Sequence, residues 1–585
     1  MGTAMINTKR WRFIAIQLIL ALMGVLIIAR IYVYQVSPQA EEFRVGTEYN
    51  YITQYPARGI IYDRNGNLLA GNQTVYEIGA DLNMIHSQGN AEAIALALSV
   101  NIGLDYGTVL NTLNQTYDSQ YIVLADYVSA EAKSKLQDYM DELDNSGKTP
   151  SISRLDGIGF KSHFERTYPE GSLASNVIGF VTRDNNGYFG VEQTYNNLLA
   201  GIPRNVIIPI NPTRVEEIPQ IEPGTTLILT LDREIQAAIE GILDQTLNDS
   251  GAESGTIIVM DPKNGEILGM TSTPRIDLND YMDYVNVFQG GTPFNRAVSQ
   301  SYEPGSVLKI LTLSAALDSG AIQPNTTFFD TGSIIVGGVA IHNWDGGAWG
   351  QQDITGCTQH SLNVCFAWIA TQTTTDTFYN YMKRFGLGHI TGIDMANETS
   401  GRLKLPGDTD WYPVDLGTNA FGQGLAVTPI QMIMAASSIA NQGKMVQPHI
   451  LKATIENGVV QNKTVEIVGN PISAQTAKEV NQILVNSLEN EASTALVPGY
   501  TVAGKTGTAQ IPVFGGYDPY QTNASFIGWG PADDPRFMVY IWLEKPKSST
   551  WSSEVAAPVF SEIVQKLVVL MGIPPDQVRA QLAGQ

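Results

Sequence analysis

The sequence predicts an α+β fold with three parts: one N-terminal transmembrane helix, a mixed α/β module, and a larger domain whose five-stranded antiparallel sheet packs between helices. Three observations lead to this class. An apolar run of helical length stands near the N-terminus, a turn-rich mixed segment follows, and strand-like runs flanked by amphipathic helices fill the remainder. The 585 residues, 43% of them hydrophobic, suffice for two or three cores.

Residues 1–36 form the predicted cytoplasmic tip and membrane anchor. Lys9, Arg10 and Arg12 precede the apolar run Phe13–Ala29. This run is longer than the apolar core of a signal peptide, and no small-residue cleavage site follows it, so we expect an uncleaved span of the cell membrane. A buried core helix is the alternative. The positive-inside rule places the N-terminus in the cytoplasm and about 550 residues outside it.

Residues 37–222 form the predicted first exterior module. The stretch PARGIIYDRNGNLLA (Pro56–Ala70) reads as a hairpin that turns at Asn65-Gly66. Helical patterns follow at about 90–113 and 129–143, and Gly and Pro then punctuate irregular connections. Because no acid–base pair or metal cluster stands out, we interpret this module as a non-catalytic spacer.

Residues 223–585 form the predicted second and larger domain. A helix is expected over Leu231–Leu247, with apolar residues on one face, and a hairpin follows around the turn Lys263-Asn264-Gly265. Three further strands are expected within 501–510, 523–530 and 536–544, and the helix Val555–Met571 is expected to close the chain. The middle of the domain is mostly helical.

Charge and composition exclude several classes. The net charge of -22 opposes binding to a phosphate backbone, so we expect no nucleic-acid partner. The six His and two Cys show no metal-ligand spacing, so we expect neither a metal nor a cofactor.

Three short motifs carry the expected chemistry. An S-x-x-K begins at Ser306, an S-x-N at Ser361 and a K-T-G at Lys505, in that order within one predicted domain. On a helix, Ser306 and Lys309 share a face, which brings a hydroxyl close to an amine. Each triplet alone is weak: Ser306 could simply cap a surface helix, and another S-x-N stands at Ser99. The order of the three motifs is what carries weight.

With these motifs the chain resembles the penicillin-recognising serine acyltransferases. The segments PARGIIYDRNGNLLA, RTYPEGSLASNVIGF, GVEQTYNNLLAG, NRAVSQSYEPGSVLKI, FGQGLAVTPIQM and AGKTGTAQ are similar to class B penicillin-binding proteins in particular. The resemblance covers nearly the whole chain. It implies that 37–222 is the pedestal or dimerisation domain and that 223–585 is the transpeptidase domain. One departure is His360, where the family often has a second serine.

The resemblance assigns a role to each motif residue. Ser306 is the expected nucleophile, and Lys309 is the expected general base, because burial and a nearby helix N-terminus disfavour its ammonium form and lower its pKa. Backbone N–H groups of Ser306 and Thr508 are the expected oxyanion donors, and Gly507 allows the strand to approach closely.

The remaining motif residues are expected to handle the substrate. Ser361 relays a proton to the departing D-alanine, Asn363 holds the donor amide, and Lys505 supplies positive potential. Thr506 and Thr508 offer hydroxyls to the terminal carboxylate; as isolated residues, both could simply be favourable strand residues.

The resemblance implies a peptidoglycan D,D-transpeptidase that is acylated by β-lactams. A β-lactam sensor or β-lactamase-like hydrolase is one alternative, and an inactive scaffold of a cell-wall complex is another. Expected partners are a D-Ala-D-Ala donor, an amine acceptor, β-lactams, the membrane, and a multi-pass glycosyltransferase of the shape, elongation, division and sporulation group. The last would contact the segment Phe13–Val36 and the pedestal. Septal or elongation role, acceptor identity and oligomeric state stay open.

The two cysteines, Cys357 and Cys365, bracket the S-x-N motif. Within one continuous helix, eight positions separate them by about 12 Å, which exceeds the reach of a disulfide. A bridge therefore requires a break near His360, and two buried thiols are an equally good interpretation.

Overall fold

The computed structural model describes residues 4–36, 49–115, 121–145, 150–209, 221–289, 291–491 and 493–583. These residues form two compact units, one of 1–57 with 201–224 and one of 58–200 with 225–585. The predicted boundary at residue 37 falls outside the described residues, and the predicted division of the chain into three domains stays a prediction.

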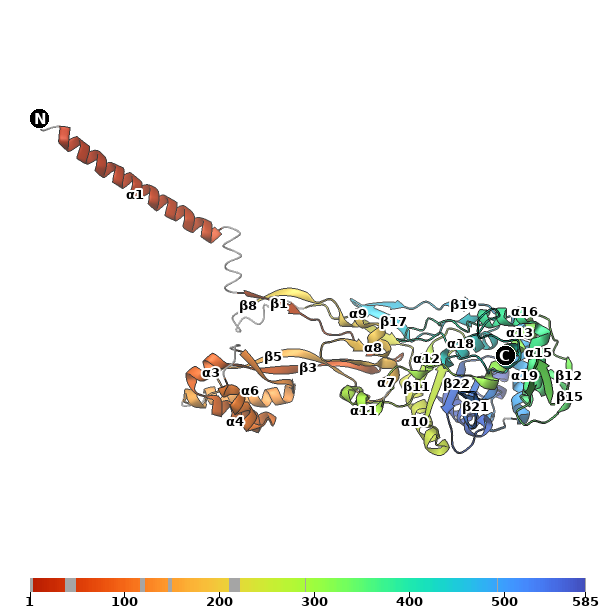
Figure 1. Ribbon diagram of the computed structural model, residues 1–585. Coiled ribbons are helices and arrows are strands. Elements are labelled where there is room, and N and C mark those ends of the chain that lie inside the picture. Colours follow the sequence, from red (N-terminus) through yellow and green to blue (C-terminus); the bar gives the residue numbers. More distant parts are fainter. Residues whose placement is uncertain are drawn as a thin grey trace. The chain divides into compact units, whose positions relative to one another are not determined.

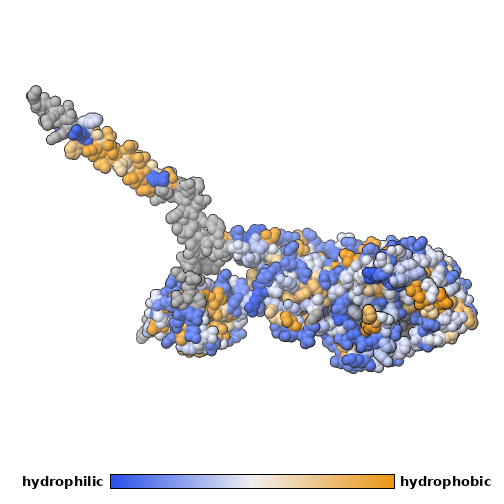
Figure 2. All heavy atoms as spheres, viewed as in Figure 1, coloured by the Kyte–Doolittle hydropathy of each residue, from blue (hydrophilic) through white to orange (hydrophobic). Residues whose placement is uncertain are grey.

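The first unit contains the predicted anchor. Helix α1 (Ala4–Val36) includes Arg10–Val33, the one helix among the described residues that is long and apolar enough to cross a bilayer. No part of its most apolar window is buried by the rest of the protein, so a core helix is the wrong interpretation of this run. Figure 2 shows the apolar surface of α1 between polar patches. Strands β1 (Tyr49–Gln54) and β8 (Arg204–Pro209) pair antiparallel in the same unit.

The hairpin expected at Asn65-Gly66 is present in the second unit. Strands β2 (Ile61–Tyr62) and β3 (Leu68–Asp81) pair antiparallel. The Asp63 carboxylate accepts hydrogen bonds from the backbone N–H groups of Asn65 and Asn67, and Gly66 takes a left-handed φ of 89°. An Asx turn of this kind explains why the local sequence alone predicted it.

The helices of the first module pack on one sheet layer. Strand β3 pairs with β4 (Tyr121–Ser129) and with β5 (Ile158–Thr167), which the sequence did not predict. The expected helix at 90–113 is two helices, α4 (Ala91–Ile102) and α5 (Tyr106–Asn114), because Gly103 ends α4 at a φ of 78°. The expected helix at 129–143 is α6 (Ala130–Asn145). The shorter elements here are α3 (Leu82–Gln88), η1 (Ser151–Ser153), α7 (Ser175–Ile178), β6 (Phe180–Val181), β7 (Gly187–Tyr188), α8 (Gly190–Thr194) and α9 (Asn196–Ala200).

One sheet joins the two sequence modules of this unit. Its strand order is β18-β17-β9-β2-β3-β4, with β5 also on β3. The link is the parallel pairing of β2 with β9 (Thr226–Leu229), and β9 pairs in turn with β17 (Leu451–Glu456), which pairs with β18 (Val459–Asn462). The two parts therefore share backbone hydrogen bonds, a connection that local pattern did not reveal.

The five-stranded antiparallel sheet of the catalytic domain is confirmed. Its order is β11-β10-β22-β21-β20, and every neighbouring pair is antiparallel. The strands are β10 (Ser254–Met260), β11 (Ile267–Ser272), β20 (Ala503–Val513), β21 (Gly516–Gly530) and β22 (Phe537–Glu544).

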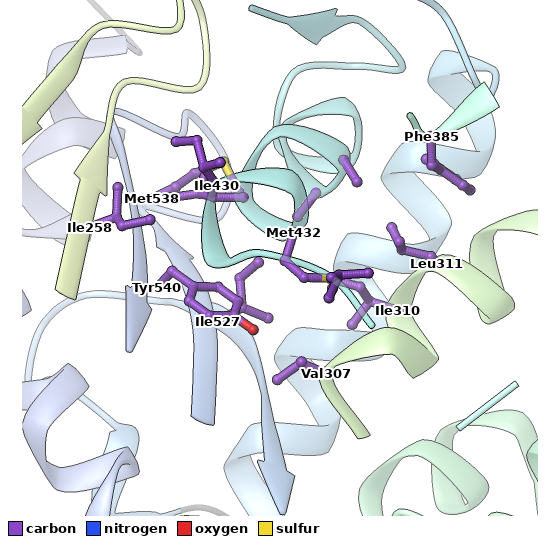
Figure 3. Packing of buried hydrophobic residues seen from close by; sticks show 14 of the residues in the cluster. Ile258, Val307, Ile310, Leu311, Phe385, Ile430, Met432, Ile527, Met538 and Tyr540 are labelled. Atoms are coloured by element: carbon purple, nitrogen blue, oxygen red, sulfur yellow. The ribbon is translucent and has the colours of Figure 1, made fainter. Parts of the chain in front are cut away.

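Helices cover both faces of this sheet (Figure 1). On one face, α10 (Arg233–Ser250) and α21 (Ala557–Leu570) contribute Ile239 and Phe560 to a buried cluster. On the other face lie α13 (Lys309–Asp318) and α18 (Pro429–Ala440), whose side chains meet those of β22 in the core shown in Figure 3. The expectation that Val555–Met571 closes the chain was wrong: a further short helix, α22 (Asp576–Ala583), follows Pro574-Pro575.

The expectation of a mostly helical middle was too strong: between β11 and β20 helices contribute more residues than strands, but loops and short strands together make up more than half. Besides α13 and α18, its helices are η3 (Leu278–Asp283), α11 (Tyr284–Val287), α12 (Arg296–Ser299), η4 (Gly305–Leu308), α14 (Ile354–Gln359), α15 (Asn363–Thr373), α16 (Thr375–Arg384), α17 (Asp415–Asn419), α19 (Ala474–Glu491) and η5 (Ser493–Ala495), and the short helix α20 (Ser552–Val555) follows β22. Short strands complete it: β12 (Thr327–Asp330), β13 (Ser333–Val336), β14 (Val339–His342), β15 (Gly350–Asp353), β16 (Met445–Val446) and β19 (Ile467–Gly469).

Candidate active site

Ser306 and Lys309 lie at the start of the helix that the first motif predicted. Ser306 is inside the 3-10 turn η4, and Lys309 is the first residue of α13, which continues from it. The N-cap of η4 is Pro304, so the N-cap interpretation of Ser306 is wrong. The neighbours Val307 and Leu308 are fully buried, whereas Ser306 is partly exposed. Figure 3 shows Val307, Ile310 and Leu311 within the core that holds this turn in place.

Lys309 reaches the second motif. Its side chain is fully buried, and Nζ lies 2.5 Å from Ser361 O, 3.1 Å from Ser361 Oγ and 2.9 Å from Asn363 Oδ1. The ring centroids of Phe366 and Phe421 lie 5.3 and 6.0 Å from the same nitrogen. The fold thus brings the amine of the first motif onto two polar side chains of the second.

The S-x-N motif occupies a turn between two helices. Helix α14 ends at Gln359 and α15 begins at Asn363, and between them Ser361 takes a left-handed φ of 53°. Such a φ is unfavourable for a residue with a Cβ, by roughly 1–2 kcal/mol, so the surrounding structure must hold it.

The break near His360 that a disulfide required is confirmed. Cys357 and Cys365 are bonded, with their Cα atoms 6.1 Å apart, and both residues are fully buried. Burial lowers the pKa of His360, whose ring stacks on Trp349 at 4.3 Å. The histidine that departs from the family pattern is therefore biased towards its neutral form and adds little charge to this loop.

The K-T-G motif lies on strand β20, at the edge of the five-stranded sheet. A Cβ on Gly507 would come within 2.5 Å of Ser525 Oγ and 2.9 Å of Pro304 O, so only glycine allows this strand to pass the nucleophile turn. Lys505 is buried, whereas Thr506 and Thr508 are partly exposed. The Thr508 hydroxyl pairs with Ser552 Oγ at 2.8 Å.

Most of the predicted residues line one cavity of about 560 Å³. Its volume lies within the usual range of roughly 300–1,000 Å³ for small-molecule sites. The predicted residues that line it are Ser306, Ser361, Asn363, Lys505, Thr506 and Thr508. Lys309 is buried behind Ser361 and Asn363, and Gly507 provides close packing of the strand.

The sequence analysis missed several residues of this cavity. Trp344, Trp551 and Glu554 line it, and so do Phe421 and Gln423 of the FGQG segment. The FGQG segment is part of the resemblance, but the sequence does not indicate that it contacts the turn that holds Ser306. Gly305 N donates to Gly422 O at 3.0 Å. No local pattern marked the two tryptophans, because they come from loops that only the fold brings together.

Glu303 lies three residues before Ser306. Its carboxylate accepts a hydrogen bond from Gly424 N at 3.1 Å and one from the Tyr517 hydroxyl at 3.4 Å. Burial raises its pKa above the ordinary value for a glutamate. Glu303 therefore connects the nucleophile turn with the loop at 421–424 and with the β20–β21 hairpin.

Comparison with known proteins identifies the two parts of the chain that follow α1. Residues 255–565 match the family model described as the penicillin binding protein transpeptidase domain, and residues 53–212 match the penicillin-binding protein dimerisation domain. Stage V sporulation protein D of Bacillus subtilis is 32% identical over 537 residues, which cover 89% of this chain and 79% of that protein. Peptidoglycan D,D-transpeptidase FtsI of Escherichia coli K12 is 27% identical and covers 89% of this chain and 84% of its own length.

Solved structures agree with this assignment. Penicillin binding protein 2X from Streptococcus thermophilus superimposes with a TM-score of 0.76 at 25% identity, covering 90% of this chain and 80% of that one. Penicillin binding protein 3 of Mycobacterium tuberculosis, complexed with ampicillin, does so with a TM-score of 0.68 at 28% identity, covering 90% and 97%. The motifs, the fold and these relatives together show that the chain belongs to the class B penicillin-binding proteins.

Proposed function

We propose that this protein is a peptidoglycan D,D-transpeptidase that works through an acyl-enzyme on Ser306. The observation that carries the proposal is the convergence of three motifs, distant in sequence, on one cavity, with the Lys309 amine hydrogen-bonded to Ser361 and Asn363. Membership of the family supports the same reaction.

The surroundings of Lys309 decide its use as a base. Nζ donates hydrogen bonds to three acceptors: the carbonyl of Ser361, Ser361 Oγ and Oδ1 of Asn363. Because an ammonium has three N–H groups and a neutral amine has two, these acceptors hold Nζ in place in either protonation state. Burial of the side chain and its position at the first residue of α13 disfavour the ammonium, which makes Lys309 a suitable base.

The acylation step follows from this arrangement. Ser306 Oγ attacks the carbonyl of the penultimate D-alanine, and its proton passes to Lys309 as the general base. The tetrahedral oxyanion is stabilised by the backbone N–H groups of Ser306 and Thr508. As the C–N bond breaks, Ser361 passes a proton to the departing amine of the terminal D-alanine and is reprotonated from Lys309.

Deacylation completes the crosslink. The amine of a second stem attacks the ester carbonyl and loses a proton to Lys309, and this proton returns to Ser306 Oγ as the ester C–O bond breaks. Lys505, Thr506 and Thr508 hold the terminal carboxylate of the donor during acylation, and Asn363 holds the donor amide. The cavity contains no other described lysine or arginine among its lining residues, which favours Lys505 for this role.

Two experiments test the proposal. Fluorescent penicillin is expected to label Ser306 covalently and to leave Ser306→Ala unlabelled; labelling of another serine would reject the site. A crosslinking assay with donor and acceptor stems then separates a transpeptidase from a β-lactam sensor or hydrolase. Hydrolysed donor without any crosslinked product would reject the transpeptidase assignment.

The anchor and the polymerase partner belong to the same proposal. The apolar helix α1, with Arg10 and Arg12 at its start, supports a single crossing with a cytoplasmic N-terminus and an extracytoplasmic catalytic domain. A multi-pass glycosyltransferase of the shape, elongation, division and sporulation group would contact this helix and the pedestal. Replacing Phe13–Val36 by an unrelated spanning helix is expected to weaken copurification. Unchanged association would place the contact wholly outside the membrane.

A further inference from the structure

Two tryptophans meet across the active-site cavity. Trp344 follows β14, Trp551 precedes α20, and their ring centroids are 5.0 Å apart in an edge-to-face arrangement. Both line the cavity, and both keep much of their surface exposed, 46% for Trp344 and 41% for Trp551. Large aromatic surfaces that stay open in a cavity are favourable places for a ligand to pack.

Each tryptophan is attached to a different catalytic motif. Trp344 Nε1 donates to the carbonyl of His360 at 3.1 Å, directly before Ser361. Trp551 precedes Ser552, whose backbone N–H donates to Thr508 Oγ1 at 3.2 Å. The aromatic pair therefore keeps a set position next to the S-x-N and K-T-G motifs, which flank the reacting bond.

The two charged side chains that line the cavity differ in burial. Among the described lining residues, Lys505 carries the positive charge and Glu554 the negative charge. Lys505 is buried, with 4% of its surface exposed, whereas Glu554 is exposed and forms no salt bridge with a described residue. Lys505 suits the donor carboxylate. Glu554, on the first turn after Trp551, suits a cation.

We propose that Trp344, Trp551 and Glu554 form a subsite for an alkylammonium chain of the peptidoglycan stem. The methylene chain packs on the indole rings, and the ammonium is attracted by the ring faces and by the Glu554 carboxylate. The inference rests on the proposed function and adds a determinant of substrate choice to it. The ammonium has two possible sources, the side chain of the donor residue before D-Ala-D-Ala and the attacking amine of the acceptor.

The donor is tested with a matched pair of substrates. Full-length protein in detergent is mixed with acylated tripeptides X-D-Ala-D-Ala, in which X is lysine or norleucine, and the rate of acyl-enzyme formation is followed by mass spectrometry. Norleucine keeps the four-carbon chain and lacks the ammonium. The lysine donor is expected to react about tenfold faster. In Glu554→Gln, and in Trp551→Leu, this ratio is expected to fall below about two. Glu562→Gln, an exposed carboxylate on α21, is expected to keep it.

The acceptor is tested in the second step. With the norleucine donor, a stem bearing a free lysine amine is added, and crosslinked product is measured against hydrolysed product. In one outcome, the lysine and norleucine donors acylate the wild type at nearly equal rates, but Glu554→Gln lowers crosslinked product relative to hydrolysed product several-fold. The acceptor amine then occupies the subsite. If neither ratio changes, or if both donors slow equally in Glu554→Gln, the subsite is overturned. Wild-type protein that penicillin does not label at Ser306 would instead reject the underlying function.

Discussion

Gly422→Ala is expected to inactivate the nucleophile without touching any motif residue. Gly422 has a left-handed φ of 85°, and a Cβ built there would lie 2.0 Å from the carbonyl oxygen of Gly305, the residue before Ser306. The nearest atoms are all backbone atoms, so no side chain can rotate away to relieve the contact. Either the 421–424 loop or the Ser306 turn must move.

The size of the movement follows from the geometry. Carbon–oxygen contacts settle at about 3.3–3.6 Å, so the two segments must separate by roughly 1.3 Å. Misplacement of a reacting group by about 1 Å can reduce a rate about a hundredfold, because the reacting atoms leave the near-attack geometry. The left-handed φ adds a strain of roughly 1–2 kcal/mol, which affects stability more than rate.

The assay is the second-order rate of acylation by fluorescent penicillin, with circular dichroism to confirm that the variant is folded. Gly422→Ala is expected to lose about a hundredfold. Gly458→Ala is the matched control, because Gly458 has a similar φ of 76° and no atom within 4 Å of its would-be Cβ. The reasoning is refuted if folded Gly422→Ala acylates within threefold of wild type, or if Gly458→Ala loses as much.

Three further predictions concern single groups. Lys309→Met is expected to stay folded and to lose at least about a hundredfold in acylation rate, because it removes the general base. The control Lys463→Met breaks an ion pair with Asp394 and is expected to acylate at the wild-type rate. A near-normal acylation rate in Lys309→Met would show that Lys309 is not the base. Glu303 has a raised pKa, so the folded state holds its proton more tightly and the free energy of unfolding falls as pH rises above the ordinary glutamate value. Glu303→Gln is therefore expected to gain stability relative to wild type between pH 4.5 and 7 in thermal unfolding, and an equal difference at both pH values would contradict this. The Cys357–Cys365 bond is expected to appear as a two-proton mass deficit in unreduced protein. Replacing both cysteines by serine is expected to lower the free energy of unfolding in denaturant by about 2–3 kcal/mol. Two alkylated thiols in oxidatively prepared protein would exclude the bond.

Local signals predicted those elements whose pattern depends on neighbouring residues alone. The apolar run of α1, the Asn65-Gly66 turn and the strands β10, β11 and β20–β22 are each recognisable in a window of a few residues. Strand β5 was missed because it alternates weakly, with many partly exposed and polar positions. The helical pattern expected at 90–113 forms two helices, because Gly103 ends the first of them in a left-handed conformation.

The sequence by itself determined the three motifs, their order, the anchor and the class of the fold, since these follow from residue type and short-range periodicity. Tertiary structure alone decided which distant groups touch. The pairing of β2 with β9, the hydrogen bond of Lys309 to Ser361 and the contact of Trp344 with Trp551 each join segments whose own residues do not indicate the partner. Such contacts arise because burying the shared core leaves few ways to arrange the connecting loops, and that choice depends on the whole chain.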